Sequence, residues 1–252
     1  ICLGEATKLS AYLLDGDKRY HVTCQLGVIT DSGDADGEVL EQLSIPNFTQ
    51  QQLRDVIEQF RGKQHQVPPM YSALKHKGQP LYKLARQGIE VDRKSREVTI
   101  YDIELISFTA DSFTLDVSCS KGTYIRTLVE DISHVLGTGG HVTMLRRVES
   151  AGYEITKAIS IEQLETVAEQ GIAVLDKQLL PSEEALPDWP SITIDDQQVS
   201  ALRHGQAIQV SDDYKSAKIR LFDQQNTFLG LGEMTETGTV SPKRVFVVDE
   251  TS

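Results

Sequence analysis

An arginine occupies an unusual position in this chain, in the first turn of a predicted helix. The segment CSKGTYIRT (residues 119–127) ends a predicted strand, turns at Gly122 and begins a helix that carries Tyr124 and Arg126. A cation at a helix N-terminus opposes the positive end of the helix dipole and costs about 0.5 kcal/mol. An arginine there could instead hold a carboxylate through two parallel hydrogen bonds and keep it ionised. The pattern leaves open a catalytic role and a simple ion pair with a surface acid.

Tyr20 is a second candidate because it begins a predicted strand directly after three charged residues. Along that strand, residues 20–26, apolar and polar side chains alternate, which is typical of a half-buried strand. An aromatic ring at the start of such a strand could stack on an unstacked base of a nucleic acid. Ordinary packing within the sheet is the alternative interpretation.

Basic residues gather in one part of an acidic chain. The 252 residues carry a net charge of −12, yet residues 61–96 contain nine lysines and arginines and only two acids. This segment includes PPMYSALK (68–75) and LYKLAR (81–86), in which tyrosines are interleaved with basic residues. Such a mixture favours contacts with nucleic-acid phosphates and sugars, and a solvated charged loop is the alternative. Arg146 and Arg147 could also contact phosphate, or they could flank a buried strand.

Other chemistries lack the residues that they need. SGDADG (32–37) is similar to a calcium loop, but Leu43 stands where that loop requires its last glutamate. The six histidines are scattered, and the three cysteines are too few and too widely spaced for a zinc cluster or a disulfide framework. No nucleophile elbow or phosphate-binding glycine loop occurs. We therefore propose no metal site, and the cysteine usage fits the reducing cytoplasm.

The elements that must position these residues predict an α+β protein. A capping box at Thr49 and Gln52 begins a helix, and an amphipathic stretch covers residues 161–175. Prolines and acids at about 180–190 mark a domain boundary. Further strands are expected at 98–106, 113–119, 207–210, 217–222, 228–234 and 245–248, and further helices at 81–87 and 123–136. The last four strands predict a small β-barrel.

Six segments together resemble the TruB family of tRNA pseudouridine synthases and occur in the family's order. They are ICLGEATK (1–8), residues 17–27, residues 30–37, PPMYSALK (68–75), CSKGTYIR (119–126) and residues 141–147. The resemblance implies a mixed, mainly antiparallel sheet in a catalytic domain of residues 1–180, with an inserted thumb loop at about 61–96. It also implies a small PUA-like β-barrel domain over residues 181–252.

The resemblance implies a reaction on the T arm of tRNA. Family members flip uridine 55 of the T loop out of its stack and isomerise it to pseudouridine through an attacking aspartate. By this resemblance Tyr20 stacks on the base and helps to remove its carbon-5 proton, and Arg126 pairs with the catalytic carboxylate. Tyr124 and Leu145 would line the pocket. The other expected substrate-binding residues are Lys8, Tyr71, Lys75 and Arg146. The resemblance also implies that the reaction needs no metal and no organic cofactor.

One departure from the family is serious. The family's nucleophile lies in a segment of the form G-x-L-D-P-x-A-x-G, and none of the 252 residues form such a segment. Asp34 and the other aspartates near the N-terminus are in the wrong context to replace it. We therefore expect that the N-terminal segment with the catalytic aspartate is missing and that this chain alone is inactive. A smaller departure is Gly140, where the family usually has a slightly larger residue.

Two other functions stay open. A non-catalytic tRNA-binding or folding factor would bind tRNA without isomerising it. An unrelated carboxylate-dependent enzyme, such as a hydrolase, would have no affinity for the T arm. No apolar run approaches the roughly 20 residues of a membrane span. We expect a cytoplasmic monomer that needs no protein partner and makes no membrane contact.

Overall fold

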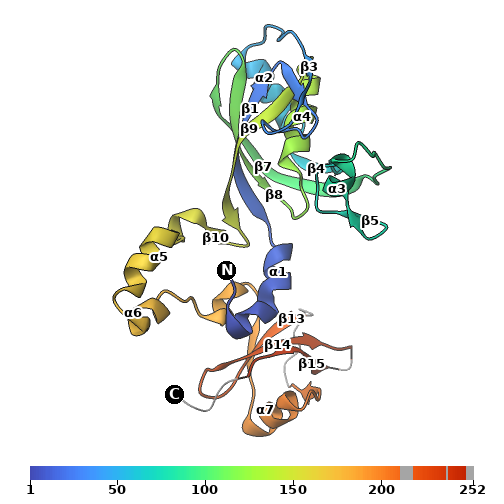
Figure 1. The fold of residues 1–252 in the computed structure, drawn as a ribbon. Coiled ribbons are helices and arrows are strands. Elements are labelled where there is room, and N and C mark those ends of the chain that lie inside the picture. The colour runs from blue at the N-terminus through green and yellow to red at the C-terminus, as the bar shows by residue number, and fades with distance from the viewer. Residues whose placement is uncertain (211–217, 237, 248–252) are drawn as a thin grey trace. The chain divides into compact units, whose positions relative to one another are not determined.

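The computed structural model describes residues 1–210, 218–236 and 238–247, and it divides into two compact units (Figure 1). The central unit is the continuous stretch Asp15–Ala158. The terminal unit combines Ile1–Leu14 with Ile159–Ser252. Each unit contains a mainly antiparallel sheet with helices, which confirms the predicted α+β class.

The central unit is built on a six-stranded sheet in which every neighbouring pair is antiparallel. In spatial order the strands are β10 (Tyr153–Glu154), β9 (Gly140–Ser150), β1 (Lys18–Leu26), β8 (Ser112–Cys119), β7 (Arg96–Phe108) and β4 (Gly62–Gln66). Alternation along β1 buries Val22, Cys24 and Leu26 on one face, as the sequence predicts. Strands β7 and β8 confirm the predicted strands at 98–106 and 113–119.

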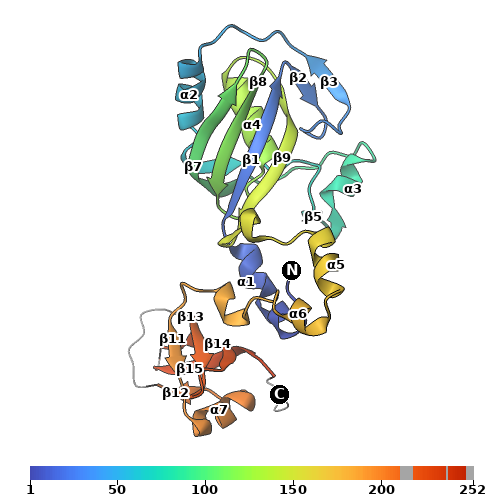
Figure 2. The same cartoon turned by 90° about the vertical axis from the view of Figure 1, so that its left-hand side faces the viewer.

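Helix α2 (Gln50–Glu58) packs against β7, and helix α4 (Ile125–Val135) packs against β1 and β9 (Figure 2). The predicted capping box of α2 is confirmed, because Thr49 Oγ1 accepts from Gln52 N while Thr49 N donates to the Gln52 side chain. Helix α4 buries Leu128 and Ile132, each at most 1% exposed. Burying each such side chain contributes about 2 kcal/mol, which fixes α4 against the sheet.

Two excursions from the sheet carry polar segments of interest. The insertion between β4 and β7 contains β5 (Lys75–His76), β6 (Gln79–Pro80) and helix α3 (Leu81–Ala85). Helix α3 confirms the helix predicted at 81–87. The second excursion is a hairpin of β2 (Val28–Thr30) and β3 (Val39–Gln42), which encloses the polar turn of residues 31–37.

The terminal unit contains a five-stranded sheet that is consistent with the expected PUA-like domain. In spatial order the strands are β11 (Ser191–Thr193), β13 (Lys218–Phe222), β14 (Phe228–Met234), β15 (Thr239–Val245) and β12 (Ile208–Gln209). Only the β11–β13 pair is parallel among the described strands of this sheet. The strand predicted at 245–248 is wrong, because β15 ends at Val245; Val248 lies outside the described residues.

The helical segments of the terminal unit come from both ends of the chain. They are η1 (Gly4–Leu9), α1 (Ser10–Asp15, whose last residue falls in the central unit), α5 (Ile161–Ala168), α6 (Ile172–Asp176), η3 (Ser182–Ala185) and α7 (Asp196–Arg203); η2 (Ile155–Lys157) closes the central unit. The stretch predicted as one amphipathic element at 161–175 is two helices, because Gly171 adopts φ +104° between them. No helix in the described part of the chain is both long and apolar enough to cross a membrane.

The first residues of the chain pack against the C-terminal strands. Leu9 shares a buried cluster with Phe222, Phe228 and Phe246. The division into domains of 1–180 and 181–252 stays a prediction, since contacts between Cα atoms group Ile1–Leu14 and the residues from Ile159 onward with the C-terminal sheet.

Candidate functional site

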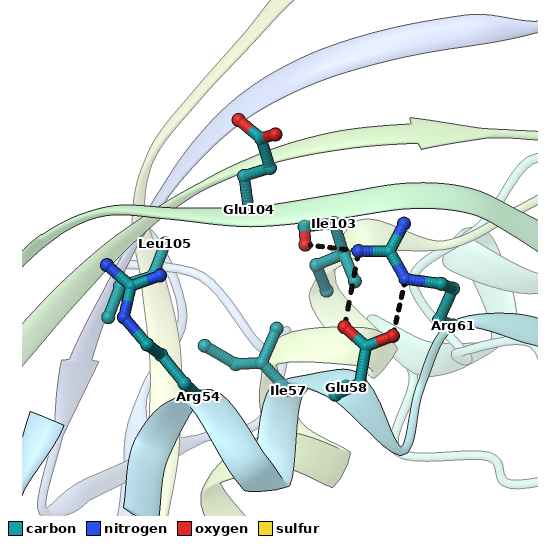
Figure 3. Close-up of a pocket in the computed structure, with 7 residues that line it drawn as sticks. All are labelled: Arg54, Ile57, Glu58, Arg61, Ile103, Glu104 and Leu105. Carbon is teal, nitrogen blue, oxygen red and sulfur yellow. Dashed lines mark hydrogen bonds and ion pairs between the residues drawn. The ribbon is translucent and has the colours of Figure 1, made fainter. Parts of the chain in front are cut away.

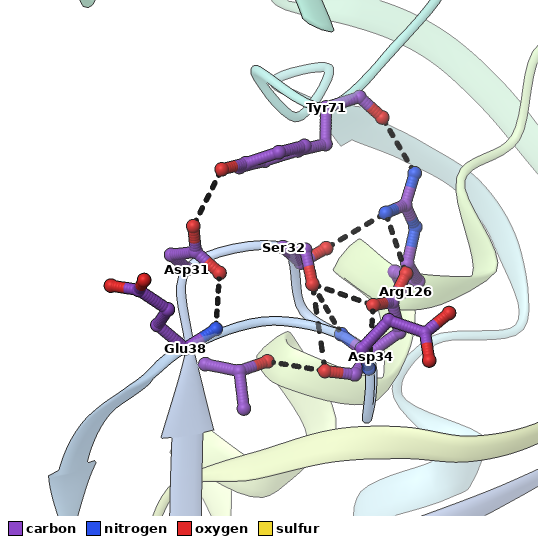
Figure 4. A network of polar contacts seen from close by, with 8 residues as sticks. Asp31, Ser32, Asp34, Glu38, Tyr71 and Arg126 are labelled. Carbon is purple, nitrogen blue, oxygen red and sulfur yellow. Dashed lines mark hydrogen bonds and ion pairs between the residues drawn. The ribbon is translucent and has the colours of Figure 1, made fainter. Parts of the chain in front are cut away.

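Arg126 of α4 lies at the centre of a polar network (Figure 4). Its Nη1 donates to Asp34 Oδ2 at 2.9 Å and to the Ser32 carbonyl at 2.8 Å, and its Nη2 donates to the Tyr71 carbonyl at 2.6 Å. The guanidinium therefore joins helix α4 to the 31–37 turn and to the insertion. The side chains of Arg126 and Asp34 are 21% and 31% exposed, so solvent screens their ion pair only partly.

The 31–37 turn holds the Asp34 carboxylate in place. Asp34 Oδ1 accepts from Ser32 Oγ at 2.5 Å, so the short polar side chains bind within the turn itself. Gly33 has φ +73°, a conformation that glycine adopts without the steric cost of a Cβ atom. Val142 N of β9 donates to the Gly33 carbonyl at 3.0 Å, which fastens the turn to the sheet. These contacts therefore fix the position from which the Asp34 carboxylate binds Arg126.

Glu130 lies one turn after Arg126 on α4 and packs against the same polar turn. A Cβ atom built on Gly33 would lie only 2.4 Å from Glu130 Oε1, so the carboxyl group abuts the Gly33 backbone. Burial raises the pKa of Glu130 to about 7; Asp131 and Asp34 add to the shift, and Arg126 opposes it. The network thus has a second carboxyl group that changes charge near neutral pH.

Tyr20 of β1 lies between Val117 of β8 and Arg147 of β9, and it packs against the core on the helix-covered face of the sheet. Burial raises the pKa of the Tyr20 phenol, while the charge of Arg147 and a hydrogen bond from it oppose the shift. Leu145 pairs with Val22, so its side chain lies on the same face as Tyr20. Leu145 is 45% exposed. This face thus presents an aromatic ring, a cation and an accessible apolar side chain.

Arg146 lies on the opposite face of the sheet. It pairs with His21 across β9 and β1, and successive residues on a strand alternate between faces. On that opposite face His21 Nε2 and Arg19 Nε contact Asp116 at 2.7 and 2.6 Å. Of the two adjacent arginines that the sequence offers as phosphate ligands, it is Arg147 that shares a face with Tyr20.

Tyr124 directly precedes α4, and its backbone is bound by the side chain of Gln66 at the end of β4. Tyr124 N donates to Gln66 Oε1 at 3.0 Å, and Gln66 Nε2 donates to the Tyr124 carbonyl at 3.3 Å. Tyr71 has a second role in the network, because its hydroxyl donates to Asp31 Oδ2 at 2.6 Å. The structure therefore brings Tyr71, Tyr124 and Arg126 to one end of α4.

Neither of the two lysines among the predicted site residues is a hydrogen-bond partner of Arg126. Lys75 is exposed on the β5–β6 hairpin of the insertion. Lys8 belongs to the terminal unit, where its Nζ contacts Glu5 Oε2 at 2.5 Å and donates to the Val245 carbonyl at 2.8 Å. The structure therefore engages Lys8 with the C-terminal sheet of its own unit.

Sequence analysis missed three residues of this site, namely Asp34, Gln66 and Glu130. Asp34 was weighed only as a calcium ligand or as a misplaced nucleophile, and no spacing rule connects it to an arginine 92 residues away. No sequence signal marks Gln66, because its burial at the end of β4 becomes visible only in the structure. Glu130 stands four residues after Arg126, a spacing that places two helix residues on one face.

A separate hollow of about 350 Å³ lies between α2 and β7 (Figure 3). Its most prominent cation, Arg61, is bound by Glu58 Oε1 at 2.7 Å and by Asp102. The charge of Arg61 is therefore met by these two carboxylates. Among the described residues, no group of three histidine, cysteine, aspartate or glutamate side chains is placed to hold a metal ion.

Solved structures define the class of fold. A chain of a Cbf5–Nop10–Gar1 complex matches with a TM-score of 0.71 and 22% identity, over 97% of this chain and 71% of that chain. A chain of an H/ACA RNP bound to a substrate RNA containing 2′-deoxyuridine matches with a TM-score of 0.70 and 20% identity, over 98% and 71% of the two chains. The fold is thus one that chains of these two complexes share.

Family models and relatives identify the chain more narrowly. Residues 1–125 match the N-terminal domain of TruB family pseudouridylate synthases, 126–187 match the C-terminal domain of tRNA pseudouridylate synthase B, and 190–246 match the C-terminal region of pseudouridine synthase II TruB. The tRNA pseudouridine synthase B of Nitrosococcus oceani is 48% identical over 97% of this chain and 80% of the relative. That of Shewanella sp. strain MR-4 is 46% identical over 99% and 81%. The chain belongs to the TruB family of pseudouridine synthases, which confirms the resemblance.

Proposed function

We propose that this chain acts in the isomerisation of uridine 55 in the T loop of tRNA, as a tRNA pseudouridine synthase. Membership of the TruB family supports the reaction class, and the relatives with 45–48% identity carry the name tRNA pseudouridine synthase B. The proposed site lies in the central unit, at the end of the sheet where β1, β9 and α4 meet the insertion.

The free edge of Arg126 is the observation that carries this proposal. Its three hydrogen bonds use both N–H groups of Nη1 and one of Nη2. Among the described residues no bond uses Nε–H or the second Nη2–H, which lie along one edge of the guanidinium. That edge can accept a carboxylate through two parallel hydrogen bonds. Arg126 is therefore equipped to hold a catalytic aspartate while Asp34 fixes its other side.

The remaining residues take roles that suit a flipped pyrimidine. Tyr20 would stack on the base and receive its carbon-5 proton; burial raises the pKa of its phenol, and the charge and hydrogen bond of Arg147 oppose that rise. Leu145 and Tyr124 would line the pocket. Tyr71 and Lys75, with the exposed basic residues of the insertion, would contact the T arm, mainly through phosphates.

The nucleophile is proposed to come from outside these 252 residues, none of which form the family's aspartate segment. Asp34 is unsuited to that role, because Oδ1 accepts from Ser32 Oγ and Oδ2 accepts from Arg126. The turn and Arg126 therefore engage both oxygens of Asp34 within the chain itself, and Asp34 leaves the Nε edge of Arg126 open for another carboxylate. The same observation favours a second candidate function, a tRNA-binding factor that does not isomerise uridine.

Tritium release from tRNA labelled at carbon 5 of uridine tests the proposal, with this chain in stoichiometric excess over tRNA. We expect the chain to bind a T-arm stem-loop without releasing tritium. The same chain extended at its N-terminus with a segment of the form G-x-L-D-P-x-A-x-G should release it, and an aspartate-to-asparagine version of the extension should not. Release by the chain itself would assign the nucleophile to one of its own aspartates. Binding without release by the extended chain would favour the non-catalytic factor.

A further inference from the structure

Gln66 is a buried polar residue that has no assigned role in the proposed reaction. It ends β4, which among the described strands pairs with β7 alone, and the residue is 3% exposed. Both polar atoms of its amide bind the backbone of one residue, Tyr124, which is 58 positions away in the sequence. A buried amide whose donor and acceptor both serve a single distant residue is a specific clamp rather than a chance contact.

The clamp acts where helix α4 lacks a cap of its own. Tyr124 is the residue before the first turn, in an extended conformation with φ −95° and ψ 106°, and no side chain caps the helix. Its carbonyl already accepts from Leu128 N at 3.1 Å, and Gln66 supplies a second donor to that oxygen. The Gln66 amide therefore gives the backbone of Tyr124 the two hydrogen bonds that a neighbouring strand could otherwise supply. It thereby fixes the direction in which α4 begins.

Gln66 also stands at the root of the insertion. The next residues are Val67, Pro68 and Pro69, and proline restricts the backbone of this connection. Arg93, at the far end of the insertion, donates from Nη1 to the Pro68 carbonyl at 3.2 Å. The insertion is therefore joined to the start of α4 at two points, through Gln66 on Tyr124 and through the Tyr71 carbonyl on Arg126.

We propose that Gln66 is a positioning residue that fixes the position of Tyr124 in the pocket and couples the insertion to the start of α4. When the insertion binds the T arm, the clamp would hold Tyr124 and Arg126 in the geometry that accepts a flipped uridine. Gln66 touches no reacting atom in this scheme. The inference rests on the proposed function, because it assumes that Tyr124 lines the uridine pocket.

Two substitutions probe the clamp, and one matched control accompanies them. Gln66→Leu removes both hydrogen bonds at nearly constant volume. Gln66→Glu keeps the shape, but only its protonated form offers both a donor and an acceptor to Tyr124. The control is Gln64→Leu on the same strand, since the Gln64 amide donates to the Gln59 carbonyl at 3.2 Å instead of to α4.

The experiment uses the 252-residue chain and a T-arm stem-loop with a fluorescent uridine analogue at the target position. Binding is measured from the anisotropy of a dye on the stem, and base flipping from the fluorescence of the analogue. We expect Gln66→Leu to bind the stem-loop within about threefold of the parent while the flipped population falls about tenfold, as the loss of one to two hydrogen bonds predicts. Gln66→Glu should recover flipping as the pH is lowered from 8 to 5, and Gln64→Leu should match the parent at both pH values.

The outcomes separate failure of this inference from failure of the proposed function. If the parent chain neither binds the stem-loop nor changes the fluorescence of the analogue, the proposed function itself is wrong. If the parent flips the base and Gln66→Leu flips it equally well, the clamp is only structural and the inference is overturned. If Gln66→Leu does not fold, the decision rests on Gln66→Glu. If Gln66→Glu flips the base equally well at pH 5 and at pH 8, the inference is also overturned.

Discussion

Asp34 and Arg126 form a hydrogen-bonded ion pair of 2.9 Å although 92 residues separate them in the sequence. The pair occupies one side of the guanidinium and leaves the Nε edge available. Because the Ser32 and Tyr71 carbonyls bind the same group, Arg126 cannot rotate without losing several hydrogen bonds at once. The geometry of this one arginine therefore depends on three separate segments of the chain.

Replacement of Arg126 by lysine should abolish this arrangement while the positive charge is kept. A single ammonium group cannot serve Asp34, Ser32 and Tyr71 and also offer a planar edge to a carboxylate. We expect Arg126→Lys to reduce base flipping in the T-arm assay by about tenfold or more. Arg54→Lys, an exposed arginine on α2, is the control and should leave flipping unchanged. Equal base flipping by the two variants would contradict the role proposed for the planar guanidinium group of Arg126.

Gly140 should tolerate no larger residue in this chain, although the family usually has one. A Cβ atom at Gly140 would lie 2.1 Å from Ser133 Oγ and 2.9 Å from Cys24 Sγ. We expect Gly140→Ala to lower the free energy of unfolding by about 1–3 kcal/mol, the usual cost of overpacking. Urea unfolding of the single variants and of the double variant Gly140→Ala with Ser133→Gly measures the coupling. The double variant should be more stable than the sum of the two single effects predicts, and strict additivity would count against this packing explanation.

The carboxyl group of Glu130 should make stability depend on pH. Its pKa is raised from 4.5 to about 7 in the folded protein, so the folded state binds more protons than the unfolded state between these values. The contribution of Glu130 to the free energy of unfolding is therefore greatest below about pH 4.5, falls as the pH rises to about 7, and is constant above that. Glu130→Gln should remove this dependence and be more stable than the parent at pH 8 but not at pH 4.5. Urea unfolding at the two pH values checks this, with the exposed Glu169→Gln as the comparison.

Lys75 and Lys8 should differ in how they affect RNA binding. If Lys75 meets a phosphate, Lys75→Ala should weaken T-arm binding and lower the slope of log K against log salt by about 1. Lys8→Ala should leave that slope unchanged and lower the thermal stability of the terminal unit, because Lys8 binds Glu5 and the Val245 carbonyl. Titrations of both variants at four salt concentrations measure the slopes. A reduced slope for Lys8→Ala alone would reverse the assignment.

Local sequence signals predicted the elements well, whereas the contacts of the site depended on tertiary structure. The capping box at Thr49 and the alternation in β1 involve neighbouring residues, so they could be recognised directly in the sequence. The partner of Arg126 could not, because it depends on how the 31–37 turn bridges to β9. The choice between Arg146 and Arg147 depends on a bulge in the pairing of β1 with β9, between Thr23 and Cys24, because this bulge lies between Val142 and the two arginines. An irregularity of one residue changes which side chain faces the pocket, and no sequence pattern marked it.

The packing of the first residues against the last strands has a consequence for synthesis on the ribosome. Glu5 Oε2 accepts from Val247 N at 2.7 Å, a contact that closes a loop of 242 residues. The terminal unit therefore cannot be completed until almost the entire chain has been translated. The central unit, Asp15–Ala158, is continuous and can assemble while the rest is still being made. During that interval the apolar side chain of Leu9 and its neighbours stay exposed to solvent. A translational pause after residue 158 would therefore prolong the time in which these side chains can aggregate or bind a chaperone.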